Sequence, residues 1–505
     1  MITNVTEYLE KTAVTYPDKT AVKDAKGEIS FFQLRNSGKR IATQLLDRHV
    51  TNRPVALYLS KNKESVISFL GINYSGNFYV PLDIKSPHAR VSAILKVIEP
   101  ELVITDKSHY DALTSFCLNR IVLYEDLIES SEIDEPAIQK TIDHKIDTDP
   151  VYSIFTSGST GIPKGVVIAH RGVIDYIDWA VRTLNIGETT IIGNQSPFYF
   201  DNSTLDIYLM YATGATLAIL PEETFSFPAR LIDQLNDWQV NLIFWVPYVF
   251  ATIANLDLFA TKRLVYLRNI FFAGDVMHNK HLNYWRTYMP DCRYVNLYGP
   301  TEITVDCTYY EVKRKFSDDE PLPIGYACKN THILILTDKG EIAKAGEQGE
   351  LCVRGSSLAL GYYNDWEKTQ QAFVQNPLNR YYPELIYRTG DLAYQNRVGE
   401  IILVGRKDSQ IKLNGYRIEL GEIETAILGT RLVDSCCAVY DYKVQQIALF
   451  YEAKTVVPLS ELRQQLSTLI PKYMLPSKII KINEMPVNAN GKINRLELSR
   501  TLNTE

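Results

Sequence analysis

The chain is poor in cysteine, with 7 among 505 residues, no C-x-x-C pair, and two adjacent cysteines at Cys436 and Cys437. This scarcity favours reduced thiols in a cytosolic protein over a disulfide-rich secreted domain. The N-terminus lacks a basic stretch followed by an apolar core, so no signal peptide is predicted. The longest apolar run, residues 242–254, is too short to span a bilayer and contains Pro247. We therefore expect a soluble, cytoplasmic protein with no membrane partner.

Neither sign of charge dominates. The chain has 53 Lys and Arg residues and 59 Asp and Glu residues, which gives a formal net charge of −6. This balance argues against a dedicated nucleic-acid binder. No internal repeat or low-complexity tract is visible, and 46% hydrophobic with 22% charged residues is typical of a globular protein. At roughly 150 residues per domain, the length corresponds to about three units with a sizeable core.

Short apolar segments alternate with helical patterns over the first 300 residues. Residues 54–60 (PVALYLS) and 102–105 (LVIT) are typical of buried strands. Residues 64–70 and 91–98, which lie between them, are typical of helices. The same alternation returns from residue 152 to about residue 297. Strands that alternate with helices predict an α/β layered fold.

The pattern changes after residue 350. Residues 349–355 (GELCVRG), 387–393 (YRTGDLA) and 400–404 are short strand candidates separated by turn residues, which predicts a smaller β-rich subdomain. Residues 405–410 (GRKDSQ) contain no apolar run and mark the expected domain boundary. About 95 residues of mixed strand and helix follow, enough for a small α+β domain.

A loop rich in Gly, Ser and Thr follows the predicted strand at residues 151–155. Residues 153–165 read SIFTSGSTGIPKG. Glycines let backbone N–H groups approach an anion closely, and the hydroxyls and Lys164 add donors and positive charge. Gly158, Gly161 and Lys164 are spaced by three, which differs from the Walker pattern. The residue types predict a phosphate-binding loop, although a Gly/Ser loop taken alone is more often a surface turn.

The order TSGSTGIPKG resembles the signature of the adenylate-forming superfamily, which includes acyl-CoA synthetases, luciferases and peptide-synthetase adenylation domains. Further motifs follow in the order of that family, so the resemblance runs along the whole chain. They are NFYVPLD (77–83), NLYGPTE (296–302), YRTGD (387–391), GRKDSQIKLNGYRIELGEIE (405–424) and NGKINR (490–495).

The resemblance implies that the protein binds ATP and Mg²⁺. Tyr298 would stack on adenine, the Asn296 amide would read its edge, and Asp391 would accept the two ribose hydroxyls. Thr301 would donate to the α-phosphate, and Glu302 would offer a hard oxygen to Mg²⁺. The implied ATP-binding residues are Thr156, Ser157, Lys164, Asn296, Tyr298, Gly299, Thr301, Asp391, Arg406 and Lys492.

Lys492 is implied to be catalytic, together with Thr301 and Glu302. A carboxylate that attacks an anionic phosphate brings like charges together, and a compact ammonium stabilises the charge that spreads in the transition state. No general base is required, because the attacking carboxylate is already ionised at neutral pH.

Asp408 matches the hinge position of the family. The resemblance therefore implies a large adenylation core over residues 1–404, a hinge at 405–409 and a small mobile α+β domain over 410–505. Lys492 would face the cleft in one state. After rotation, residues 412–415 would face it instead and admit a thiol.

Two features select a branch of the family. The run NGYRIELGEIE resembles peptide-synthetase adenylation domains and D-alanine–carrier-protein ligases. Asp201 matches the carboxylate that holds the substrate ammonium in amino-acid activators, and a buried carboxylate without such a partner would be costly. The alternative is that Asp201 caps the following helix. The chain ends soon after NGKINR, so we expect a stand-alone ligase that loads the phosphopantetheine thiol of a separate carrier protein.

The family's motifs also place a pocket for the amino acid's side chain. Its lining is predicted to be Asp201, Asn202, Leu205, Tyr248, Phe271, Ala273, Leu297, Val305 and Asp306. Most of the set is apolar, which suits a small apolar substrate. Six of these residues resemble the set in stand-alone prolyl-carrier-protein ligases of pyrrole and anatoxin-type toxin pathways, so L-proline is expected. The six are Asp201, Leu205, Tyr248, Ala273, Leu297 and Val305.

Asp306 is the exception in this pocket. If its carboxylate points inward and is ionised, it suits lysine, ornithine or arginine. If it bonds a neighbour such as Asn202 or Tyr248, the proline assignment stands. The competing interpretations of the whole chain are D-alanine activation, an acyl- or aryl-CoA ligase and a non-catalytic binding protein.

Overall fold

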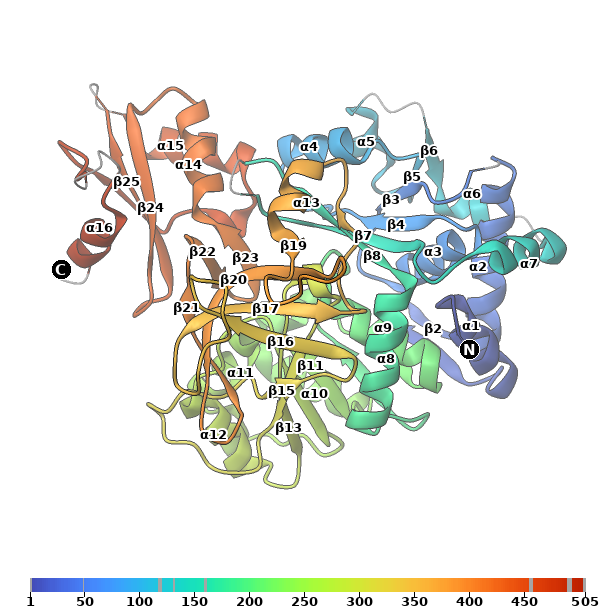
Figure 1. The fold of residues 1–505 in the computed structure, drawn as a ribbon. Coiled ribbons are helices and arrows are strands. Elements are labelled where there is room, and N and C mark those ends of the chain that lie inside the picture. The colour runs from blue at the N-terminus through green and yellow to red at the C-terminus, as the bar shows by residue number, and fades with distance from the viewer. Residues whose placement is uncertain are drawn as a thin grey trace. The chain divides into compact units, whose positions relative to one another are not determined.

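The computed structural model describes residues 2–48, 50–116, 120–129, 132–158, 161–453, 457–487 and 493–502. Within it the chain forms two compact units (Figure 1). The first unit comprises Met1–Leu82, Glu99–Ile154 and Val166–Lys407. The second comprises Asp83–Ile98, Phe155–Gly165 and Asp408–Glu505.

A nine-stranded sheet of the first unit has the order β15-β14-β13-β12-β11-β9-β10-β1-β2. The strands from β13 to β1 are parallel, and β14, β15 and β2 add antiparallel edges. Their bounds are β1 Thr20–Asp24, β2 Gly27–Ser30, β9 Ile191–Asn194, β10 Thr216–Ile219, β11 Leu242–Trp245, β12 Asn269–Phe272, β13 Arg293–Tyr298, β14 Thr308–Glu311 and β15 Tyr326–Ala327.

A seven-stranded sheet has the order β18-β8-β7-β4-β3-β5-β6. Its inner strands are parallel and almost wholly apolar, as expected for a sheet covered on both faces. The bounds are β3 Pro54–Tyr58, β4 Phe78–Pro81, β5 Leu102–Thr105, β6 Ile121–Leu123, β7 Pro150–Thr156, β8 Lys164–Ala169 and β18 Gly361–Tyr362.

The helices of the first unit pack on these sheets, and α8 and α9 lie side by side (Figure 1). They are α1 Thr6–Thr15, α2 Phe31–Leu46, α3 Lys63–Tyr74, α5 Tyr110–Thr114, α6 Tyr124–Glu129, α7 Glu135–His144, α8 His170–Leu184, α9 Asn202–Thr213, α10 Pro228–Asp237, α11 Pro247–Asn255, α12 Asn279–Tyr288 and α13 Trp366–Ala372. A membrane crossing would need a longer and more apolar helix than any in the described ranges.

A five-stranded antiparallel sheet follows residue 330, in the order β16-β17-β20-β19 with β21 paired to β20. The bounds are β16 Thr331–Leu336, β17 Gly349–Gly355, β19 Phe373–Gln375, β20 Leu385–Gln395 and β21 Ile401–Arg406. The predicted fold class, layered α/β with a β-rich part, is confirmed. Because β21 continues through Arg406, the first two residues of the predicted hinge lie in a paired strand.

The second unit has a small three-stranded sheet, β24-β25-β26, and the hairpin β22-β23. Its helices bury one apolar cluster that includes Ile423, Leu449 and Leu462. The bounds are α4 His88–Ile98, β22 Gln410–Leu413, β23 Tyr416–Glu419, α14 Leu420–Gly429, β24 Ser435–Asp441, β25 Gln446–Glu452, α15 Leu459–Leu469, β26 Lys478–Lys481 and α16 Arg495–Thr501.

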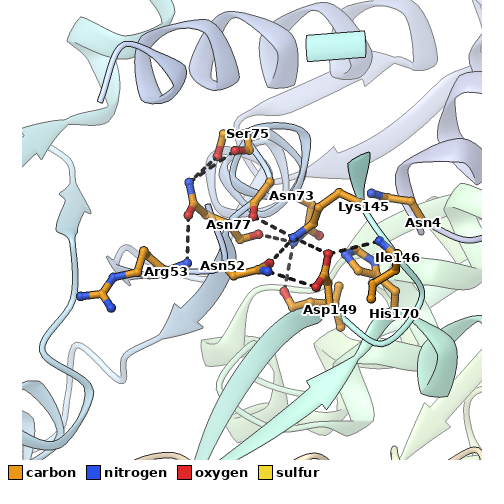
Figure 2. A network of polar contacts seen from close by, with 12 residues as sticks. Asn4, Asn52, Arg53, Asn73, Ser75, Asn77, Lys145, Ile146, Asp149 and His170 are labelled. Carbon is orange, nitrogen blue, oxygen red and sulfur yellow. Dashed lines mark hydrogen bonds and ion pairs between the residues drawn. The ribbon is translucent and has the colours of Figure 1, made fainter. Parts of the chain in front are cut away.

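A buried polar network joins the N-terminal segment of the first unit to the starts of β7 and α8 (Figure 2). The Lys145 ammonium donates to the carbonyl of Gly76 at 2.9 Å and pairs with Asp149 at 3.3 Å. His170 Nδ1 accepts the backbone N–H of Val5 at 3.3 Å. Burial, followed by the nearby Lys145 charge, lowers the pKa of His170 to about 3. His170 is therefore a neutral structural residue at physiological pH.

Candidate functional site

The NLYGPTE segment forms a tight turn between β13 and β14. A Cβ atom on Gly299 would lie 2.1 Å from the carbonyl oxygen of Val305, so only glycine fits there. Thr304 and Val305 adopt positive φ values of 58° and 69°. Such backbone conformations are uncommon for non-glycine residues and cluster at functional sites. The turn thereby brings Val305 and Asp306 next to the end of β13.

Three of the predicted nucleotide ligands meet beside this turn. The Tyr298 hydroxyl donates to Asp391 Oδ2 at 2.5 Å, and Arg406 Nη1 donates to Asp391 Oδ1 at 2.6 Å. The register of β20 and β21 pairs Asp391 directly with Arg406. Burial, then the Asp391 charge, raises the pKa of Tyr298 well above its usual value, so its hydroxyl stays a donor. Asp391 is thus a fixed, mostly buried carboxylate.

Asn296 lies on the same strand as Tyr298. Its side chain is 7% exposed, and its Nδ2 donates to the carbonyl of Pro323 at 2.8 Å. One of its two amide hydrogens is therefore already engaged by the protein.

Glu302 and Thr301 lie in the short 3₁₀ turn after Pro300. Glu302 is fully buried, and its Oε1 accepts the Tyr362 hydroxyl at 2.8 Å. Within the described ranges, no cluster of three or more His, Cys, Asp or Glu side chains could hold a metal ion. A single carboxylate still fits Mg²⁺, because this ion binds through one or two carboxylates and completes its shell with phosphates and water.

The Gly-rich loop belongs to the second unit. The Thr156 hydroxyl is buried and has no hydrogen-bond partner within the described part of the chain. The Ser157 hydroxyl donates to the carbonyl of Arg417 at 2.7 Å. A Cβ atom on Gly158 would lie 2.1 Å from the carbonyl oxygen of Ile162. Lys164 is the first residue of β8. The loop is closely folded, and its residues 159 and 160 lie outside the described residues.

The predicted catalytic lysine and the predicted hinge aspartate both belong to the C-terminal part of the chain. Lys492 lies outside the described residues. Asp408 is the first residue of the second unit's C-terminal segment, and its Oδ1 accepts the backbone N–H of Gln410 at 3.2 Å.

The predicted amino-acid pocket draws on the start of α9, on α11, on β12 and the residue after it, on β13, and on the turn that follows β13. Asp201 is the N-cap residue of α9, yet its side chain makes no capping hydrogen bond. Asn202 begins that helix, and Tyr248, in α11, is 52% exposed. The apolar members are buried in one hydrophobic cluster: Leu205, Phe271, Ala273, Leu297 and Val305. The helix-cap alternative for Asp201 is therefore not what the structure has.

The remaining member, Asp306, is 2% exposed and is hydrogen-bonded by a side chain of α8. The Tyr176 hydroxyl donates to Asp306 Oδ2 at 2.6 Å. Burial and the Asp306 charge raise the pKa of Tyr176, so this donor is not lost at physiological pH. Tyr176 and Tyr362 were missed in the sequence, because each lies far along the chain from the carboxylate it bonds. Apolar periodicity places Tyr176 on the inner face of α8 but does not reveal its partner.

Comparison with known proteins identifies the family to which the chain is related. Residues 9–363 match the family model described as AMP-binding enzyme. Zwittermicin A synthase ZmaJ of Bacillus cereus is 31% identical over 514 residues, covering 99% of this chain and 95% of that protein. The D-alanine–D-alanyl carrier protein ligase of Lacticaseibacillus casei is 31% identical over 521 residues, with all of both chains covered.

A solved structure, holo-PA1221, is an NRPS protein containing adenylation and PCP domains bound to a vinylsulfonamide inhibitor. It is 25% identical with a TM-score of 0.83, and the match covers 99% of this chain and 84% of that one. The resemblance stated from the motifs is confirmed at the level of the superfamily, whereas the resemblance to prolyl ligases stays a prediction. On the motifs, the fold and these relatives together, the chain belongs to the AMP-binding enzyme family.

Proposed function

We propose that the protein activates an amino acid with ATP and transfers it to the phosphopantetheine thiol of a separate carrier protein. The proposal rests mainly on Asp201. This acidic residue precedes α9 without capping the helix, and it lies next to a buried apolar cluster. An amine-bearing substrate supplies a cation that such a carboxylate can bind. A full-length relative that is named as a D-alanyl carrier protein ligase supports the same activity.

The chemistry proceeds in two steps. The amino acid's carboxylate oxygen attacks the α-phosphorus of ATP, an aminoacyl-AMP anhydride forms, and pyrophosphate leaves. The carrier's thiolate sulfur then attacks the acyl carbon, a thioester forms, and AMP leaves. Asp391 and Tyr298 would hold the nucleoside, and Thr156, Ser157 and Lys164 would contribute to phosphate binding. Lys492 and Thr301 would stabilise the charge that develops on the α-phosphate.

A Mg²⁺ ion accompanies ATP in this proposal. Glu302 would hold it, and the bound ion would neutralise charge on the ATP phosphates. The buried position of Glu302 and its hydrogen bond from Tyr362 fix the direction of the carboxylate.

The proposed substrate is L-proline. The hydrogen bond from Tyr176 partly satisfies Asp306 from within the protein, so the pocket does not require a cationic side chain. The five apolar members favour a small apolar side chain. D-Alanine is the second candidate, because a full-length relative is named for it.

An amino-acid panel in ATP–pyrophosphate exchange tests this assignment. It should include L-proline, D-alanine, L-ornithine, L-lysine and L-arginine, together with aliphatic and aromatic acids that lack an amine. We expect L-proline to give the highest rate. Faster exchange with a basic amino acid would reject proline, and exchange only with amine-free acids would reject amino-acid activation. Thioester formation on a holo carrier, compared with free coenzyme A, tests the acceptor.

Tyr176→Phe should shift the specificity of the pocket. The change removes the hydroxyl that Asp306 accepts, and a hydrogen bond to a charged group contributes about 1.5–3 kcal/mol. We expect the ratio of kcat/KM for L-ornithine to that for L-proline to rise about tenfold or more. Pyrophosphate exchange with both amino acids measures it. Tyr8→Phe is the matched control, because Tyr8 of α1 donates to a different carboxylate, Asp178 of α8, which is not a member of the pocket. An unchanged ratio in Tyr176→Phe would contradict the role given to the pair.

Asp408→Pro should separate the two half-reactions. Proline fixes φ near −65°, and a hinge at 405–409 would lose the dihedral change needed for transfer. We expect pyrophosphate exchange within about twofold of wild type and carrier loading reduced about tenfold or more. Asp408→Ala is the control, since it removes the side-chain bond to Gln410 without fixing φ. Normal loading by Asp408→Pro would place the hinge elsewhere.

A further inference from the structure

Helix α9 holds a second carboxyl group, Asp206, that the proposed chemistry does not use. Asp206 directly follows Leu205 of the predicted pocket and is fully buried. Its Oδ2 accepts a hydrogen bond from Asn194 Nδ2 at 2.8 Å. Asn194, also fully buried, is the last residue of β9. The side chains thus join the helix that bears Asp201 to the sheet beneath it.

The same two side chains each keep an unsatisfied oxygen. Asp206 Oδ1 and Asn194 Oδ1 are both buried, and neither has a hydrogen-bond partner among the residues that the structure describes. The orientation of the Asn194 amide is fixed, because its second Nδ2 hydrogen goes to the carbonyl of Ser196 at 3.3 Å. An ionised Asp206 would therefore leave two acceptors buried without a donor, which is costly.

One added proton would satisfy both oxygens. We propose that Asp206 is a protonated carboxylic acid in the folded protein, whose Oδ1–H donates to Asn194 Oδ1. With the existing bond to Oδ2, this closes a two-bond acid–amide ring between α9 and β9. Asp206 is then a positioning residue that holds α9, and with it Asp201 and Leu205, for the amino acid. The effect on the amino acid rests on the proposed function, whereas the protonation does not.

The charges around Asp206 agree with this assignment. Burial raises the pKa of Asp206 to about 7, although the Asn194 hydrogen bond and the Lys61 charge oppose the rise. Lys61 donates to the carbonyl of Gln195 at 3.0 Å, on the loop after β9. The elements packed against α9 include α1, α8, β9 and β10, and side chains of α9 also form hydrogen bonds with α3 and β4. None of them contributes a charge that acts on Asp206 among the described residues.

Asp206→Asn tests the proposal, because an amide can keep both bonds of the ring at every pH. In wild type, the folded pKa lies above the unfolded value near 3.8, so the folded state binds the extra proton. Wild type should therefore lose stability relative to the variant from about pH 4 to about pH 7, with no further loss above that. We expect the melting temperature of Asp206→Asn minus that of wild type to grow by several degrees over this window.

The second readout is the KM for the amino acid in pyrophosphate exchange. The ring in wild type opens as Asp206 ionises, so this KM should rise severalfold relative to the variant from about pH 7 to pH 8.5. The variant's own KM should show no such step. If no amino acid supports exchange, the proposed function fails, while the melting-temperature difference still decides the protonation of Asp206.

Two further variants keep the test decisive. Asp237→Asn makes the same chemical change at an exposed position of α10 and should leave the melting-temperature difference flat with pH. The exchange Asn194→Asp with Asp206→Asn restores an acid–amide pair and should restore the wild-type pH profile. A flat difference for Asp206→Asn would overturn the proposal. Failure of both Asp206→Asn and the exchange to fold would also overturn it, since Asp206 would then be needed as an ionised group.

Discussion

Asp201→Ala is expected to lower kcat/KM for the amino acid about a hundredfold or more in pyrophosphate exchange. Removing one partner of a buried, hydrogen-bonded charge pair costs about 2–5 kcal/mol, much of it because the other charge is left unpaired. Here that other charge is the substrate's ammonium. The KM for ATP should change far less, because Asp201 lies at the start of α9, whereas Tyr298 and Asp391 lie on β13 and β20.

A matched variant separates binding from helix stability. Asp365 is the N-cap residue of α13, and its carboxylate does accept the backbone N–H of Lys368 at 3.1 Å. Asp365→Ala should therefore lose about 1 kcal/mol of stability with activity preserved. Asp201→Ala should show the reverse, a nearly unchanged melting temperature with activity lost. If Asp201→Ala melts early and retains its KM for the amino acid, Asp201 is a structural residue.

Asp391→Asn is expected to raise the KM for ATP about thirtyfold. The amide keeps the shape of the side chain but removes the charge that Arg406 faces at 2.6 Å, and it offers a single acceptor where the carboxylate offers two. A loss of about 2 kcal/mol, usual for one partner of a buried charged pair, corresponds to that change. Initial rates of exchange measured against ATP at saturating amino acid give the value.

Glu350→Gln provides the control for this change. Glu350 lies on the neighbouring strand β17, and its Oε2 accepts a hydrogen bond from Arg388 Nε at 3.0 Å. The substitution is chemically the same, and both positions lie in the five-stranded sheet. We expect it to lower the melting temperature with the KM for ATP unaffected. If wild type and Asp391→Asn have the same KM for ATP, Asp391 does not bind the nucleotide.

Local patterns predicted the elements well where burial alone decides them. Residues 54–60 and 102–105 became β3 and β5, and residues 64–70 and 91–98 lie within α3 and α4. The strands are short apolar runs, as expected where both faces of a sheet are buried. The helices have apolar residues at the helical period, as expected where one face is packed. The long apolar run at 242–254 divides at Pro247, which is the first residue of α11.

In the candidate site, only the residues that lie in the family's motifs could be predicted from the sequence. The resemblance named Tyr298, Asp391 and Arg406, and the structure brings them together. Tyr176 and Asn194 could not be found in the same way. Their partners lie 130 and 12 residues away, and the pairing depends on how α8 and β9 pack, which no local sequence pattern encodes.

The order of strands in the nine-stranded sheet has a consequence for synthesis. β1, at residues 20–24, pairs with β10 at residues 216–219, and α1 packs against α9. α1 and β1 thus lack these two partners until roughly 200 further residues have been added, which takes about 10–40 s at 5–20 residues per second. During that interval β1 can pair with β2 and α1 can pack on α2, but the edge of β1 that pairs with β10 and the side of α1 that packs on α9 stay uncovered. We therefore expect the uncovered surfaces to favour chaperone binding until translation has passed residue 213, where α9 ends and the site that depends on it can form.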